Sequence, residues 1–367
     1  MKKFLSVIGI SVMLVTLFSF GAGAYNFTDS QEKYWEYFEE ALPEGVQSPE
    51  NEDELLSGVG FDSLVGEIMN ALKFGSGSAV SLFALLFGIA VIISASESAS
   101  LSENPALNRH ATAGVTVIAA VLIFGKIGRM CFSVREGIEE LSSFFSALIP
   151  ILTGIMTSGG NLSSAASQSL NMNITLAAVS YIACELLMPL VFTLFSLAMA
   201  ASMDTGTVGA VAKSVKNLFT WILGICSTVV IASITMQSVV AGAKDSAYLR
   251  AARYAASGMI PVVGSTVSSA LAALSGGLSY IKTTVGMSAV LVIITLAVSP
   301  LINLLLHRLA FSISISFLEL AGSTGGVRVY GAFRSALDAL LSVYVVTVIV
   351  YITELVVFMK CGVSVIV

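Results

Sequence analysis

Long apolar segments with few charges recur along most of this chain, and they constrain its fold more than any other feature. The sequence is 56% hydrophobic and only 11% charged, whereas a soluble domain carries about 25% charged residues. About 20 apolar residues in a helix cross the hydrocarbon core of a bilayer with every backbone hydrogen bond satisfied. The sequence therefore predicts an all-α, polytopic membrane protein in contact with membrane lipid.

Eight apolar segments follow residue 77, at 79–94, 111–124, 144–156, 174–201, 218–241, 287–306, 309–321 and 336–359. Two of them, 144–156 and 309–321, are shorter than the rest, and a Ser/Gly/Asn-rich loop is expected at 158–171. The prediction is six to eight transmembrane helices, with six if both short segments fail to span. Basic residues favour cytoplasmic loops, but with eight spans seven of them fall on each side.

The N-terminal part is predicted to leave the cytoplasm. Residues 1–24 have two lysines, an apolar middle and a Gly/Ala end, as in a secretory signal peptide; an uncleaved first helix is the alternative. From Tyr25 to Lys73 twelve acidic residues meet two lysines, a net charge of −10. We expect residues 25–76 to form an exported acidic arm, either two helices lying on a partner or on the membrane domain (77–367), or a disordered linker.

The stretch 244–286 lies between two apolar segments and is unusually rich in small residues. It carries Lys244, Arg250, Arg253 and Lys282, and Pro261 interrupts any single straight helix. We expect an interfacial helix that leads into a broken or re-entrant element; two short surface helices joined by a turn are the alternative. The candidate pore or docking residues are Arg250, Arg253, Tyr254, Gly258, Pro261, Gly264, Gly276 and Gly277.

Three acidic residues stand inside or at the ends of apolar segments: Glu185, Glu319 and Glu354. A carboxyl at membrane depth costs on the order of 3 kcal/mol on insertion scales, so such groups often mark a path for ions or substrate. Glu185 also shares a helix face with the carbonyl that Pro189 leaves free. The structural alternative is a protonated Glu that makes one hydrogen bond between helices.

Motifs for catalysis or cofactor binding are not found. The cysteines Cys131, Cys184, Cys226 and Cys361 form no Cys-x-x-Cys pair, and only two histidines occur. The segment 206–214 superficially resembles a phosphate-binding loop, but Ala212 stands where that motif requires Gly. The expectation is therefore no enzyme activity, no cofactor, no metal site and no nucleic-acid partner.

The run from Arg253 to Ser265, RYAASGMIPVVGS, resembles the stage III sporulation protein AE family of endospore-forming bacteria. The overall layout is also similar, with a signal peptide, a short exported region and many spans. The resemblance implies a role in the mother-cell membrane around the forespore, as part of a multi-protein channel or secretion-like apparatus. It also implies a separate ATPase and ring-forming proteins as partners.

Two hypotheses follow. The first is a pore-forming or scaffold subunit of that sporulation channel, with no chemistry of its own. The second is a self-contained secondary transporter coupled through Glu185. A membrane protease, the third class, lacks the serine and zinc motifs that it would need.

Overall fold

The computed structural model describes residues 61–98, 105–158, 162–200, 207–259 and 264–360, and for 235–259 and 264–284 it describes the backbone alone. The signal peptide expected at 1–24 and the arm up to residue 60 lie outside the described residues. The elements are α4 (Phe61–Ser98), α5 (Pro105–Ser158), α6 (Leu162–Tyr181), the π-helical turn η1 (Ile182–Leu187), α7 (Met188–Ala200), α8 (Thr207–Met259), α9 (Gly264–Leu320) and α10 (Thr324–Lys360). All described elements are helical, which confirms the all-α prediction.

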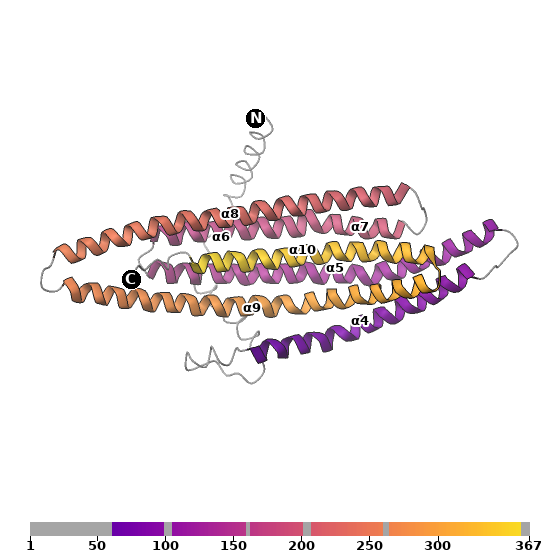
Figure 1. Ribbon diagram of the computed structural model, residues 1–367, viewed down its shortest axis with the longest axis horizontal. Coiled ribbons are helices and arrows are strands. Elements are labelled where there is room, and N and C mark those ends of the chain that lie inside the picture. Colours follow the sequence, from indigo (N-terminus) through magenta and orange to yellow (C-terminus); the bar gives the residue numbers. More distant parts are fainter. Residues whose placement is uncertain (1–60, 99–104, 159–161, 201–206, 260–263, 361–367) are drawn as a thin grey trace, which may run out of the picture.

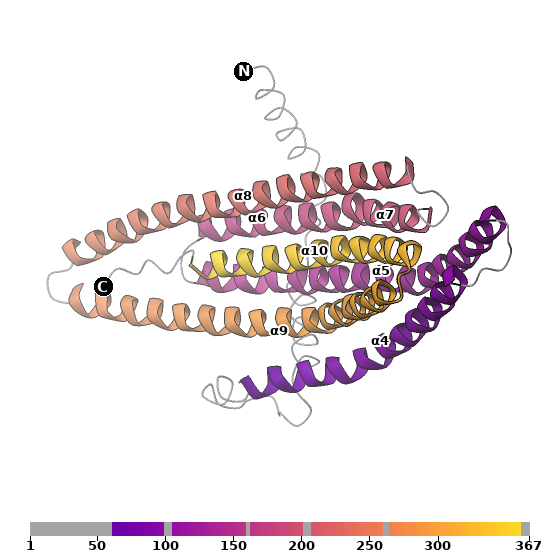
Figure 2. The same cartoon turned by 45° about the vertical axis from the view of Figure 1, so that its right-hand side comes forward.

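The helices lie side by side along one long axis (Figure 1). At one end α8 and α9 project beyond the other helices, and at the opposite end α4 and the start of α5 do so (Figures 1 and 2). The helices α6, η1 and α7 follow one another without a loop.

Six helices of the described chain are long and apolar enough to cross a membrane, judged by length and composition. The number agrees with the lower end of the prediction because two pairs of apolar segments share a helix. Segments 111–124 and 144–156 both belong to α5, and 287–306 and 309–321 both belong to α9. The charged middle of α5 continues the helix, since Arg135 and Glu139 form an i,i+4 pair there.

The prediction of a loop at 158–171 is wrong for most of these residues, because α6 already begins at Leu162. One polar residue of this helix, Asn173, donates to the carbonyl of Ser169 in the preceding turn at 2.8 Å. Ser and Asn therefore do not have to form a loop here.

The helices are longer than a bilayer requires. At 1.5 Å per residue, α10 with 37 residues and α9 with 57 residues extend for about 55 Å and 85 Å. The hydrocarbon core of a bilayer is about 30 Å thick. A large part of each rod therefore lies in water, in the headgroup region or against other protein.

The helix α10 carries a regular row of core residues, in which buried positions repeat every seven residues. Nine residues in this pattern are at most 3% exposed: Tyr330, Phe333, Leu337, Leu340, Tyr344, Thr347, Tyr351, Glu354 and Phe358. A seven-residue repeat of buried positions is the geometry of coiled-coil packing between long helices. We call these nine residues the α10 seam; α10 packs against α5, α7, α8 and α9.

Candidate functional site

Between α6 and α7 the α-helix gives way to the π-helical turn η1 without a loop. Pro189, two residues after η1, has no N–H to donate to the carbonyl of Glu185, four residues earlier. The N–H of Met188 instead bonds to the carbonyl of Ala183, five residues back. Such π-turns frequently occur at functional sites, and this one carries Glu185 in its middle.

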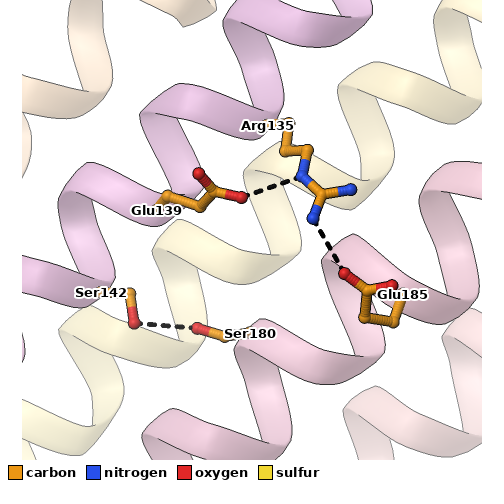
Figure 3. Close-up of polar contacts among 5 residues, drawn as sticks. All are labelled: Arg135, Glu139, Ser142, Ser180 and Glu185. Carbon is orange, nitrogen blue, oxygen red and sulfur yellow. Dashed lines mark hydrogen bonds and ion pairs between the residues drawn. The ribbon is translucent and has the colours of Figure 1, made fainter.

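Glu185 forms an ion pair with an arginine of a different helix (Figure 3). The guanidinium of Arg135 on α5 donates to Glu139 Oε1 at 2.8 Å and to Glu185 Oε1 at 2.9 Å. The side chains are partly open to the surroundings, with 42% of Arg135, 58% of Glu139 and 52% of Glu185 exposed. One base between two acids leaves the group with a net negative charge when all three are ionised.

These charges border a surface hollow of about 450 Å³ between α5 and α6. Its lining consists of Arg135, Glu139, Ser142, Ser143, Ala177, Ser180, Tyr181, Cys184 and Glu185. We call it the polar hollow. Among its residues, Ser180 Oγ donates to Ser142 Oγ at 3.0 Å, as Figure 3 shows.

A buried hydroxyl continues this contact into the bundle. Ser180 Oγ lies 3.1 Å from the hydroxyl of Tyr351, whose side chain is 1% exposed. The ring of Tyr351 packs against Phe145 at 4.8 Å between centroids. Three hydroxyls therefore lead from the polar hollow to the α10 seam.

The arrangement suits ion pairing, binding of a polar group and exchange of protons. A group of three or more potential metal ligands is not found among the described residues. Ser180 Oγ bonds to Ser142 Oγ and to the hydroxyl of Tyr351, and no histidine lines the hollow.

The structure does not bring the three predicted acidic residues together. Glu185 lies in the polar hollow, Glu319 is exposed near the end of α9, and Glu354 is buried in the α10 seam. Sequence reasoning missed Arg135 and Glu139, although an Arg and a Glu spaced i,i+4 between two apolar segments were a visible signal.

The candidate pore or docking residues are predicted within 244–286. The described part of this stretch belongs to α8 and α9, at the end of the bundle where these two helices project beyond the others (Figure 2). Arg250, Arg253, Tyr254 and Gly258 belong to the backbone of α8. Gly264 begins α9, Gly276 and Gly277 continue it, and Pro261 lies outside the described residues. A pore or docking role for these residues stays a prediction.

Six long apolar helices with few charged positions place the chain in the class of polytopic α-helical membrane proteins. More particularly, it belongs to the stage III sporulation protein AE family, whose model matches residues 50–364. The chain is 26% identical over 188 residues to the stage III sporulation protein AE of Bacillus subtilis (strain 168). That alignment covers 51% of this chain and 47% of the relative, so it spans about half the length of each. No solved structure matches the chain.

Proposed function

We propose that this protein is an integral membrane subunit of a channel or secretion-like complex between mother cell and forespore. In this role it forms part of the pore or its scaffold and catalyses no reaction itself. The observation that carries the proposal is the family match, which extends over residues 50–364 and so includes all six apolar helices. The family is named for a stage of sporulation and not for a reaction.

The proposed location is the mother-cell membrane around the forespore, with the acidic arm outside the cytoplasm. The proposed partners are the other subunits of the complex, including a separate ATPase and ring-forming proteins. The net charge of −10 between Tyr25 and Lys73 supports a basic surface on the partner that the arm contacts.

Affinity purification from sporulating cells tests this proposal. The tagged chain replaces the AE protein in Bacillus subtilis, and its co-purifying proteins are identified by mass spectrometry. We expect other stage III sporulation proteins and an ATPase. In a variant that lacks residues 30–60 the chain should stay in the membrane and lose at least one partner. Purification of the intact chain alone, from a strain that sporulates normally, would overturn the proposal.

A self-contained transporter is the second candidate, and one specific observation favours it. Glu185 pairs with Arg135 at a π-turn in an open hollow, and ionisable residues in membrane helices commonly line transport routes. Purified protein in liposomes that moves a solute down an ion gradient, with loss of transport in Glu185→Gln, would support this function over the first.

A further inference from the structure

Glu354 is the one acidic member of the α10 seam. It is 2% exposed, and neither carboxyl oxygen has a hydrogen-bond partner within the described structure. No charged side chain of the described residues pairs with it. An ionised carboxylate in such a place lacks the compensation that buried charges require.

The surroundings of Glu354 are uncharged over a considerable length of the bundle. Glu354 is the only charged residue in the segments 141–157 of α5, 165–184 of α6 and η1, 285–299 of α9 and 345–359 of α10. The ionisable groups on the elements around it lie elsewhere along these helices. Those on α5 to α8 include Arg135, Glu136, Glu139 and Glu140 on α5, Tyr181 at the end of α6, Cys184 and Glu185 on η1, and Cys226 on α8. Those on α9 and α10 include Lys282, His307 and Arg308 on α9, and Arg334, Asp338, Tyr344, Tyr351 and Lys360 on α10 itself.

A polar route nevertheless ends on the face of α10 that carries Glu354. Tyr351 precedes it by three residues and occupies the same face of α10, since residues three apart are neighbours on a helix. Because the hydroxyl proton of Ser180 is directed to Ser142, the hydroxyl of Tyr351 donates to Ser180. The hydroxyls of Tyr351, Ser180 and Ser142 therefore form a directed chain that opens into the polar hollow.

We propose that Glu354 is a buried proton-binding site that is neutral in this conformation and exchanges its proton with water through Tyr351, Ser180 and Ser142. Neither carboxyl oxygen bonds to Tyr351 directly, so when the acid ionises its O–H bond breaks and the proton passes to a water molecule that enters between Glu354 and Tyr351, which hands a proton on to the chain. Each hydroxyl accepts one proton and passes on one, so that a carboxylate remains in the seam and a proton reaches the hollow. Protonation keeps the seam packed, and loss of the proton puts an uncompensated charge between α10 and its neighbours.

This inference goes beyond membership of a complex, because it links the packing of the bundle to proton binding. The bland alternative is that Glu354 only sets the register of α10, as isolated polar residues do in coiled-coil cores. The proton-binding role and the register-setting role differ in whether the proton of Glu354 exchanges with water by way of Tyr351.

Infrared spectroscopy of the full-length protein in liposomes separates them. At neutral pH we expect a C=O stretching band of a protonated carboxyl that moves when glutamate is labelled with ¹³C at the carboxyl. The band should be absent from Glu354→Gln and from the equally neutral Glu354→Met. It should persist in Glu136→Gln, whose carboxyl is exposed.

Exchange into D2O tests the route. Replacement of the carboxyl proton of Glu354 by deuterium shifts its C=O band. In Tyr351→Phe this shift should develop about tenfold more slowly than in the unaltered protein. Tyr344→Phe removes another buried hydroxyl of the seam, one that bonds to the carbonyl of Ala297, and should exchange at the normal rate.

Absence of a glutamate band at neutral pH would overturn the proposal, and so would equal exchange rates in Tyr351→Phe and the unaltered protein. The ¹³C label identifies the band without any substitution, so that misfolding of a Glu354 variant does not decide the result. The measurement uses the purified chain, and its outcome is therefore independent of the complex proposed above.

Discussion

Arg135 and Glu185 are separated by 50 positions in the sequence, and their side chains meet at 2.9 Å in the polar hollow. The contact joins the charged middle of α5 to the one π-turn of the described chain. It links α5 to η1 at a surface that remains open.

A double-mutant cycle measures this contact. We expect Arg135→Gln and Glu185→Gln each to lower the free energy of unfolding, with a coupling of about 0.2–1 kcal/mol because both side chains are partly exposed. Thermal unfolding in detergent provides the measurement. Zero coupling would show that the pair contributes nothing to stability.

The variant Pro189→Ala restores the N–H that a regular helix would donate to the carbonyl of Glu185. We expect η1 to become α-helical, which turns Glu185 away from Arg135, since successive helical residues are rotated by about 100°. The Arg135–Glu185 coupling should then vanish from the cycle measured in this background. Coupling that persists would mean that packing, and not the proline, holds the π-turn.

Gly137 lies at a close approach of α5 to α9 and α10. A Cβ atom added there would lie 3.2 Å from Cγ of Pro300 and 3.5 Å from the ring of Tyr344. We expect Gly137→Val to cost about 1–3 kcal/mol of stability through overpacking.

Gly128→Val is the matched control, on the same helix with nothing within 4 Å of an added Cβ. Its effect should stay within about 0.5 kcal/mol. Equal melting temperatures for the two variants would contradict the close packing of α5 against Pro300.

Tyr330 ties α10 to α4 through a buried hydrogen bond from its hydroxyl to the carbonyl of Leu86, at 2.8 Å. We expect Tyr330→Phe to lower the free energy of unfolding by about 1 kcal/mol, the usual net contribution of such a hydrogen bond. Chemical denaturation in mixed micelles measures the loss. The longer bond of Tyr344 to Ala297, 3.4 Å, should matter less, and the reverse order would contradict this account.

The position of the α8–α9 turn relative to the membrane is open to direct measurement. With six crossings, the turn lies on the same side as the acidic arm. In a chain without native cysteines, Ala256→Cys should therefore react with a membrane-impermeant maleimide in intact cells. Thr324→Cys, at the opposite end of the bundle, should react only after permeabilisation. The opposite pattern would exclude six crossings with an exported arm.

Much of the fold could be predicted because hydropathy directly reports which segments avoid water. The all-α class and the approximate number of spans followed from that alone. The number of separate helices did not, since α5 continues through Lys126 and Glu140 and α9 through His307 and Arg308. Arg308 in this helix forms an ion pair with Asp338 of α10, a partner that lies 30 residues further on.

The candidate site was only half visible in the sequence. Glu185 could be identified from its apolar neighbours and Pro189, but Arg135 becomes its partner only when α5 packs beside η1. Glu354 looked like any acid in an apolar segment. Its burial without a partner depends on the rotation of α10, which a single sequence does not reveal.

The π-turn holds one residue more than the same length of α-helix would need. Removing a single residue between Ile182 and Leu187 would thus remove the extra residue and keep the register of α6 and α7, although Pro189 would still lack an N–H to donate. At any other position in the six long helices, deleting one residue would rotate every following side chain of that helix by about 100° away from its packing partners. This short turn is therefore where the bundle can shorten by one residue with least damage, at the cost of the contact between Glu185 and Arg135.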